Sequence, residues 1–455
     1  MRWSILGITT SVIMAVFSWI GPDAWEADFS RDTGEVLNIW CWNEEFLYCM
    51  QENYPGYKDN GDGTGTIGDV TVNWIVSETY DLGYQSKLKE ALTGQKDADD
   101  DDKVDIFLVE ADYAAEYTNA ADVCISMQEL GLTPYMSDQY RYTLDVVRDD
   151  EGNINGSAWM ASPGIFAYRR SAAKQVFGTD DPEEIQRYFS DWDRFAKSAE
   201  RLADKGWKAL AGYDDAYRVY AQNVSEPWVK DGKICIDDNL MRWVEQTKDF
   251  TDKGYNRKTT QWTVEWMDGI GSSGDVFGYF GPQWFVDYSL QYSALEDFRG
   301  ESEAGNGTWG DWAVIEGPQP YFWGGFWICV AQGCDNTGLA ADIIYQLTCN
   351  EEVMEGIVSE NWPFCNNREV MKRLVKDEEP NGFLGGQRAL ENYIACAESI
   401  RVERGTAYDW ALSENFRWTM TYYFDGWLNL DEALDSFYTA AKEEYPELGI
   451  AGADR

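Results

Sequence analysis

The sequence of 455 residues contains no histidine. This absence excludes Ser-His-Asp and Cys-His catalysis, zinc sites of the H-E-x-x-H type and any pH switch that depends on imidazole. Any catalysis by this protein would have to use carboxylate, lysine, tyrosine or cysteine side chains.

Basic residues are scarce, with 37 Lys and Arg against 80 Asp and Glu and a formal net charge of −43. Nucleic acids and anionic lipid headgroups are bound through Lys and Arg, which neutralise phosphate. We therefore expect no nucleic-acid partner and no binding to an anionic membrane surface. The acidity predicts high solubility and stays compatible with a cationic ligand.

Two kinds of metal site are also missing from the sequence. The nine cysteines contain no C-x-x-C pair, which argues against structural zinc. The stretch "DNGDGTGTIGD" (59–69) lacks the alternating acids and the final Glu of a calcium loop, so it predicts a hairpin turn. We expect neither a metal ion nor another cofactor.

A mostly apolar run extends from Ile5 to Ile20, after one early Arg and before the helix-breaking pair Gly21-Pro22. This pattern is typical of a signal peptide, and the run is short for a membrane span. Because the residues before Asp28 offer a poor cleavage site, an uncleaved N-terminal anchor stays an alternative. Both interpretations of residues 1–27 predict an extracellular protein, either secreted or held at the cell surface.

Strands and helices are predicted to alternate in the first part of the mature chain. Apolar and β-branched runs at 35–42, 69–77 and 104–112 predict strands, and the spacing at 44–54 and 84–94 predicts helices. Such alternation predicts a parallel sheet covered on both faces. Further helices are expected at 192–205 and 239–253, and from 338 to the end the pattern is almost wholly helical. The sequence contains no flexible linker. If the protein has two domains, the chain therefore has to pass between them more than once.

Aromatic residues are abundant, with 22 Trp and 27 Tyr. Flat rings stack against the apolar faces of pyranoses, and carboxylates and amides then fix the sugar hydroxyls. Segments that combine aromatic rings with acids or glycines recur along the chain. They lie at 42–46, 110–113, 157–164, 212–217, 278–285, 321–327 and 415–423.

The stretch "YFWGGFW" (321–327) is predicted to form one wall of a sugar cleft. Its glycines would clear space for the ligand. If it is a strand, Trp323 and Trp327 point to the same side, because they lie four residues apart. Tyr321 and Phe326 are expected nearer to the core or the rim.

Paired acids raise the alternative of a secreted glycoside hydrolase, which needs two carboxylates about 5 to 9.5 Å apart. Glu44 and Glu45 are adjacent and point in different directions, so they cannot form that pair. Glu110 could pair with Asp214 or Asp215 if the fold brings them together.

Several stretches, in this order, resemble the carbohydrate-binding extracellular solute-binding proteins of ABC importers, the family of maltose-binding protein. They include "VDIFLVEADYAAEY", "GNINGSAWMASPGIFAYRR", "DWDRFAKSAERLADKGWKAL", "GYFGPQWFVDYSL", "WAVIEGPQPYFWGGFWICVAQGC", "NWPFCNNREV" and "FRWTMTYYFDGWLNLDEALDSFYTAAKE". The resemblance implies a two-lobed α/β fold of the periplasmic-binding-protein type. Each lobe would hold a mostly parallel sheet flanked by helices, with several hinge crossings between the lobes and a helical C-terminus.

The resemblance also implies how the chain is divided between the lobes. Residues 35–155 and 314–362 would form the first lobe, and residues 156–313 and 363–455 the second. A monomer is expected, which delivers an oligosaccharide to a membrane permease and does no chemistry.

The expected ligand contacts come from the resemblance and from the aromatic and acidic segments. The resemblance implies that Asp112 holds sugar hydroxyls and that Trp284 and Trp418 stack against sugar rings. The full predicted set is Glu45, Asp112, Trp159, Asp214, Asp215, Trp284, Trp323, Trp327 and Trp418. An alternative within the same fold is a polyamine or quaternary amine in an aromatic cage beside Asp112, Asp214 and Asp215.

Overall fold

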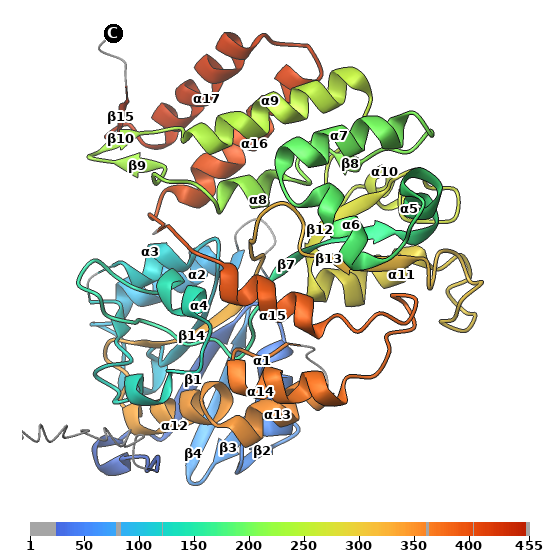
Figure 1. Ribbon diagram of the computed structural model, residues 1–455. Helices are drawn as coiled ribbons and strands as arrows, with labels where there is room; N and C mark the ends of the chain where they lie inside the picture. Colours follow the sequence, from blue (N-terminus) through green and yellow to red (C-terminus); the bar gives the residue numbers. More distant parts are fainter. Residues whose placement is uncertain (1–23, 79–82, 121, 361–363, 404, 452–455) are drawn as a thin grey trace, which may run out of the picture.

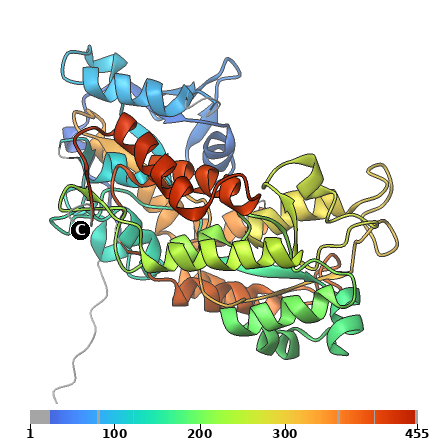
Figure 2. The same cartoon turned by 90° about the horizontal axis from the view of Figure 1, so that it is seen from above.

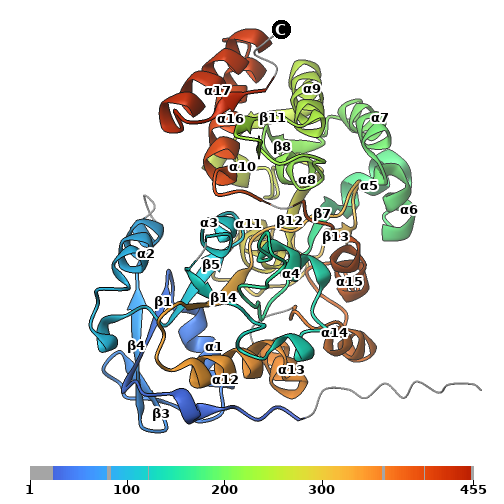
Figure 3. The same cartoon turned by 90° about the vertical axis from the view of Figure 1, so that its left-hand side faces the viewer.

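The computed structural model describes residues 24–78, 83–120, 122–360, 364–403 and 405–451. These residues form two α/β lobes that are stacked one above the other in Figures 1 and 3. The predicted two-lobed class is therefore confirmed. Of the predicted signal peptide or anchor, residues 1–23 lie outside the described residues.

The first lobe is built on a seven-stranded sheet with the order β2-β3-β4-β1-β5-β14-β6. Its strands are β1 (Val36–Cys41), β2 (Tyr57–Asp59), β3 (Thr64–Ile67), β4 (Val70–Val76), β5 (Ile106–Glu110), β6 (Cys124–Ile125) and β14 (Phe326–Ala331). The strands predicted at 35–42, 69–77 and 104–112 are β1, β4 and β5. The apolar run of β5 is buried on both faces, with Ile106 and Val109 at most 2% exposed.

The expectation of a mostly parallel sheet is wrong, because most strand pairs of the first-lobe sheet are antiparallel. In the first lobe β1 pairs in parallel with β4 and β5, whereas β14 is antiparallel to β5. The predicted hairpin turn at 59–69 joins β2 to β3, and β3 turns directly into β4, so these pairs are antiparallel as well. Short turns can join only antiparallel strands, and β14 arrives from the other lobe rather than through a helix of its own lobe.

Helices pack around this sheet. They are α1 (Glu45–Asn53), α2 (Gly83–Gly94), α3 (Ala114–Thr118), α4 (Arg141–Val146), α12 (Thr337–Thr348), α13 (Glu351–Glu360) and α14 (Arg368–Leu374). The helices predicted at 44–54 and 84–94 are α1 and α2. Figure 1 shows α12, α13 and α14 in orange, and α13, which contacts its two neighbours, also contacts α1 although it lies far from α1 in sequence.

The second lobe has smaller sheets. The central strand β7 (Gly164–Arg169) pairs antiparallel with β12 (Gly278–Pro282) and β13 (Trp312–Ile315), and β8 (Leu210–Gly212) pairs in parallel with β11 (Asn256–Thr259). The strands β9 (Val229–Lys230), β10 (Lys233–Ile234) and β15 (Gly449–Ile450) form a third sheet. Phe166 on β7 lies in the core, with its ring centroid 4.7 Å from that of Phe280 and 5.3 Å from that of Phe195.

Helices make up most of the second lobe. They are α5 (Arg170–Phe177), α6 (Pro182–Phe189), α7 (Trp192–Ala203), α8 (Tyr217–Ala221), α9 (Asp238–Lys253), α10 (Val264–Met267), α11 (Gln291–Ala294), α16 (Asp409–Phe424) and α17 (Leu430–Glu444). The predicted helices at 192–205 and 239–253 are α7 and α9, and each begins after an Asp whose side chain accepts a backbone N–H of the first turn. Seen from above in Figure 2, α9, α16 and α17 lie together on the outer face.

The chain passes between the lobes three times, through segments 147–163, 316–325 and 375–408. The third segment contains α15 (Leu390–Ser399), which packs against β7 and α14 and lies between the lobes in Figure 1. The strand pairing places β13 with the second lobe and β14 with the first. The predicted residue bounds of the two lobes stay a prediction.

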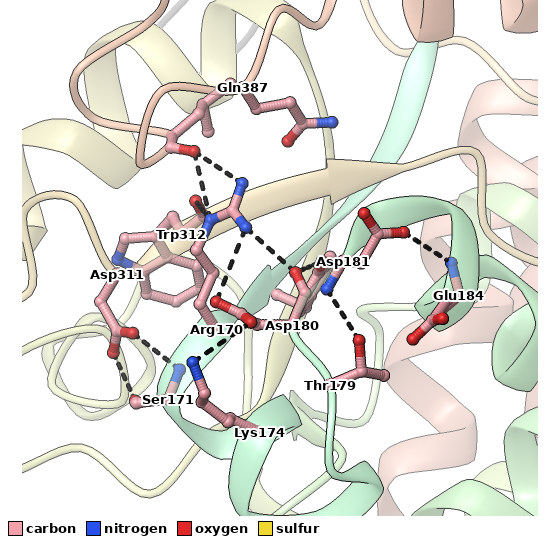
Figure 4. Close-up of polar contacts among 12 residues, drawn as sticks. Arg170, Ser171, Lys174, Thr179, Asp180, Asp181, Glu184, Asp311, Trp312 and Gln387 are labelled. Atoms are coloured by element: carbon pink, nitrogen blue, oxygen red, sulfur yellow. Dashed lines mark hydrogen bonds and ion pairs between the residues drawn. The ribbon is translucent and has the colours of Figure 1, made fainter.

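Arg170 connects the second lobe to the third crossing segment. Its Nε donates to the carbonyl oxygen of Trp312 at 2.9 Å, and its Nη2 donates to that of Leu384 at 2.9 Å, as part of the network in Figure 4. The side chain of Gln387 accepts the backbone N–H of Val314 and donates to its carbonyl oxygen, each at 2.8 Å. These bonds fix the crossing segment to β13 and therefore to the second lobe.

Candidate functional site

A cavity of about 300 Å³ lies between the two lobes and receives residues from both of them. Its walls are mostly aromatic and contain two carboxyl groups. The lining residues are Trp42, Glu45, Glu110, Met160, Trp284, Tyr288, Trp323, Gly324, Gly325 and Phe326.

The first lobe contributes side chains from the ends of two neighbouring strands. Trp42 directly follows β1, Glu45 begins α1, and Glu110 is the last residue of β5. Because β1 and β5 are parallel, their carboxyl ends meet at the same edge of the sheet. The sheet thus brings an indole and two carboxyl groups to one wall of the cavity.

The second lobe contributes Trp284 and Tyr288, which follow the end of β12. Tyr288 lies in a π-helical turn, η5 (Phe285–Leu290), and Trp284 immediately precedes it. Turns of this kind are rare and occur often at functional sites. The Trp284 Nε1 donates to the carbonyl oxygen of Trp323 at 3.0 Å, and the two ring planes meet at 72° with centroids 5.5 Å apart. The hydrogen bond therefore fixes the two indoles, and their inclined faces form a corner of the cavity wall.

Two adjacent glycines turn the chain between Trp323 and β14. Gly324 and Gly325 have φ values of +75° and +111°, which glycine adopts without strain. A Cβ atom on Gly324 would lie 3.3 Å from the Nε1 of Trp284. The glycines therefore clear space at the cavity wall, and they also end the extended conformation of the segment.

The predicted strand alternation across this segment is wrong, because β14 begins only after the glycines. Trp327 is 1% exposed, and its indole donates to the carbonyl oxygen of Thr143 at 2.7 Å inside the first lobe. Phe326 lines the cavity in its place, while Tyr321 is fully buried, in line with the prediction of a core position.

The pKa values of the two carboxyl groups of the cavity are both raised. Burial raises the pKa of Glu45, and a hydrogen bond from Asn43 opposes this rise. Burial, followed by repulsion from Asp112, raises the pKa of Glu110 from its usual 4.5 to about 8. A neutral carboxyl group can both donate and accept hydrogen bonds, as a sugar hydroxyl requires.

Asp112 lies just beyond β5, but its carboxylate is bound to the other lobe. Nη1 and Nη2 of Arg218 on α8 donate to its two oxygens at 2.8 and 2.7 Å. Burial would raise the pKa of Asp112, but the charge and hydrogen bonds of Arg218 lower it below its ordinary value. The pair lines a second, smaller cavity of about 170 Å³, together with Trp410 and Arg417.

Asp214 and Asp215 face a neighbouring loop rather than the aromatic cavity. Asp214 accepts the backbone N–H of Gln261 at 3.1 Å, and Asp215 accepts the indole N–H of Trp266 at 2.6 Å. Burial, followed by repulsion from Asp214, raises the pKa of Asp215 to about 7. The pairing of either residue with Glu110 that a glycoside hydrolase would need is therefore not assembled in this cavity.

Two further predicted residues lie outside the aromatic cavity. Trp159 is fully buried and stacks between Phe46 and Phe326, with centroids 5.3 and 5.2 Å away. Trp418 is 65% exposed on α16 and packs edge-on against Tyr422. Trp159 supports the cavity wall from behind, whereas Trp418 lies on the surface of the second lobe.

Of the predicted set, Glu45, Trp284 and Trp323 meet in the aromatic cavity, and their role in binding stays a prediction. Sequence reasoning did not single out Trp42, Tyr288 or Phe326. Trp42 and Phe326 lie in the aromatic segments 42–46 and 321–327, so composition could have indicated them. Tyr288 lies outside the aromatic segments, and its position at the cavity depends on the π-helical turn, which the sequence does not indicate.

Among the described residues, no cluster of three or more Cys, Asp or Glu side chains could hold a metal ion. Within those residues, no helix combines the length and the apolar character that a bilayer crossing requires.

The sequence matches a family model described as "Bacterial extracellular solute-binding protein" over residues 62–369. No curated protein matches the chain in sequence. A crystal structure of an extracellular solute-binding protein of family 1 superposes with a TM-score of 0.71 at 16% identity, over 90% of this chain and 100% of that chain.

Two sugar complexes share the fold. The galacto-N-biose-/lacto-N-biose I-binding protein of the ABC transporter from Bifidobacterium longum, in complex with lacto-N-biose, has a TM-score of 0.62 at 14% identity and covers 92% of this chain and 100% of its own. The GacH receptor of Streptomyces glaucescens GLA.O, solved unliganded and with acarbose, has a TM-score of 0.61 at 15% identity, covering 90% of this chain and 98% of its own. At these identities the likeness shows the fold.

Proposed function

Because the chain belongs to the family of bacterial extracellular solute-binding proteins, we propose that it binds an oligosaccharide between its lobes and delivers it to an ABC permease. The family and its structural neighbours are binding proteins, so the proposal involves no chemical step. The observation that carries it is the interlobe cavity, whose walls combine Trp42, Trp284, Trp323 and Phe326 with two carboxyl groups.

The walls of the cavity suit a sugar ring in two respects. The steeply inclined indoles of Trp284 and Trp323 offer flat apolar surfaces on which the C–H faces of a pyranose can stack. Glu45 and Glu110 can hydrogen-bond the hydroxyls at the edge of the same ring. The sugar complexes of two structural neighbours support this ligand class.

A cationic ligand is the second candidate, because Glu45 and Glu110 both lie within an aromatic box. The electrostatics favour the sugar. A cation needs an ionised carboxylate beside it, whereas burial, followed by repulsion from Asp112, raises the pKa of Glu110 to about 8. The acids that the sequence suggests for an amine, Asp112, Asp214 and Asp215, are hydrogen-bonded to protein groups.

A thermal-shift screen distinguishes these ligands. The panel contains maltose, maltotriose, lacto-N-biose and acarbose on one side, and spermidine and choline on the other. A ligand at a hundred times its Kd stabilises the folded protein by about 2.7 kcal/mol, which gives a clear rise in Tm. We expect the rise with at least one sugar and with neither amine. A rise in Tm with the amines alone would show that the ligand is a cation and not a sugar. Release of reducing sugar from the oligosaccharides, measured separately, would indicate a hydrolase.

A further inference from the structure

Trp262 continues the aromatic surface of the cavity toward solvent, although it is not part of the cavity wall. Its ring plane is 18° from that of Trp284 with centroids 6.2 Å apart, and its centroid lies 5.5 Å from that of Trp323. The side chain is 46% exposed. An indole in contact with both main walls of the site therefore presents a large apolar surface to water.

The backbone of Trp262 is in the left-handed region, with φ of +69°. A bulky residue rarely adopts this conformation, and such strain concentrates at functional sites. Gly or Asn would adopt this conformation with less strain, whereas the indole of Trp262 also packs against Trp266 and Phe285, with centroids 5.4 and 6.1 Å away. The conformation thus indicates that the placement of this indole matters.

Neighbouring hydrogen bonds hold the loop in that conformation. The residue before Trp262, Gln261, donates its N–H to Asp214 at 3.1 Å, and the indole of Trp266 donates to Asp215 at 2.6 Å. Thr263 caps the following turn by accepting the N–H of Trp266 at 3.3 Å. The two acids thus act as positioning residues for the loop. A side chain fixed in advance loses little conformational entropy when a ligand covers it.

We propose that Trp262 is the stacking platform for a second sugar ring, outside the cavity, and that it makes the protein selective for disaccharides and longer chains over monosaccharides. This inference rests on the proposed function. A first ring would occupy the corner of Trp284 and Trp323, and the next ring of the chain would cover the exposed face of Trp262. The burial of that face is then gained only by a ligand with at least two rings.

The test is calorimetric titration of matched sugars: galactose against lacto-N-biose, and glucose against maltose and maltotriose. The variant is Trp262→Gly, because glycine adopts φ +69° without strain, and its circular dichroism spectrum should match that of the wild type. Trp262→Phe keeps an aromatic face and should keep most of the affinity. Trp427→Gly is the matched control, since Trp427 is another loop tryptophan and is 78% exposed.

In the series that the wild type binds, we expect Trp262→Gly to weaken disaccharide binding roughly tenfold and monosaccharide binding less than about twofold. Equal losses for both sugars, or no loss for either, would overturn the inference and leave the proposed function intact. So would a wild type that binds the monosaccharide as tightly as the disaccharide. A wild type that binds none of these sugars, and not acarbose either, would instead contradict the proposed function.

Discussion

Asp112 and Arg218 form a two-pronged ion pair across the lobes, with nitrogen–oxygen distances of 2.8 and 2.7 Å. Asp112 follows β5 of the first lobe, and Arg218 lies on α8 of the second. The guanidinium carbon also lies 4.8 Å from the ring centroid of Trp323, a wall of the aromatic cavity. Arg218 therefore contacts both Asp112 in the other lobe and Trp323, a wall of the proposed ligand site.

Loss of this pair should loosen the lobes. We expect Arg218→Ala to lower the free energy of unfolding by about 1–3 kcal/mol, because it leaves a partly buried carboxylate without its charged partner. The radius of gyration of the ligand-free protein, measured by small-angle X-ray scattering, should rise as the lobes separate. The control is Arg141→Ala, which removes an exposed ion pair with Asp145 and should cost at most about 1 kcal/mol. An unchanged radius in Arg218→Ala would show that the pair does not hold the lobes together.

Gly324 should be needed for the shape of the cavity. We expect Gly324→Ala to lower stability by about 1–2 kcal/mol, because φ is +75° there, and to weaken binding, because the new Cβ would lie 3.3 Å from Trp284 Nε1. Gly426→Ala is a matched control with φ of +78° and no atom near its Cβ position. It should lose similar stability and keep full affinity in calorimetry. Equal affinities for both variants would contradict the role of Gly324 in the cavity.

Glu110 should make stability depend on pH. Its pKa is about 8 in the folded protein, raised by burial and then by Asp112, against a usual 4.5. The folded state therefore keeps this proton after the unfolded state has lost it, so stability falls as pH rises from about 4.5 to about 8. Glu110→Gln removes this decline and should gain about 1 kcal/mol or more relative to wild type across that window.

Urea unfolding at several pH values measures this effect. Glu129→Gln, a substitution at an exposed position, is the control and should follow the wild-type curve. A constant difference in unfolding free energy between Glu110→Gln and wild type across the pH range would show that Glu110 titrates normally.

The local elements were predictable because their signals are short-range. The apolar runs of β1, β4 and β5 and the spacing in α7 and α9 depend only on neighbouring residues, and the structure confirms them. The direction of β14 was not predictable, because it depends on where the chain re-enters the first lobe. The same holds for Phe326 and Trp327, whose orientations reverse when two glycines with positive φ precede them.

The aromatic character of the candidate site was predictable from the sequence, whereas the identity of several residues that line it was not. Aromatic segments indicated Trp284 and Trp323, which do meet. The acids Asp112, Asp214 and Asp215 point instead toward Arg218, Gln261 and Trp266, and a sequence does not show which partner a carboxylate will find. Buried carboxylates need such partners, so an acid in a promising segment is often already satisfied by the protein.

The central claim is that stacking on the interlobe indoles binds the ligand, and calorimetry of the best sugar of the panel with Trp284→Ala tests it most directly. We predict that this variant loses affinity by about 1 kcal/mol or more, because its ring forms one wall of the cavity. Trp418→Ala, which removes a 65% exposed indole from α16, should bind as the wild type does. Wild-type affinity in Trp284→Ala, or a larger loss in Trp418→Ala, would contradict the assignment of the ligand to this cavity.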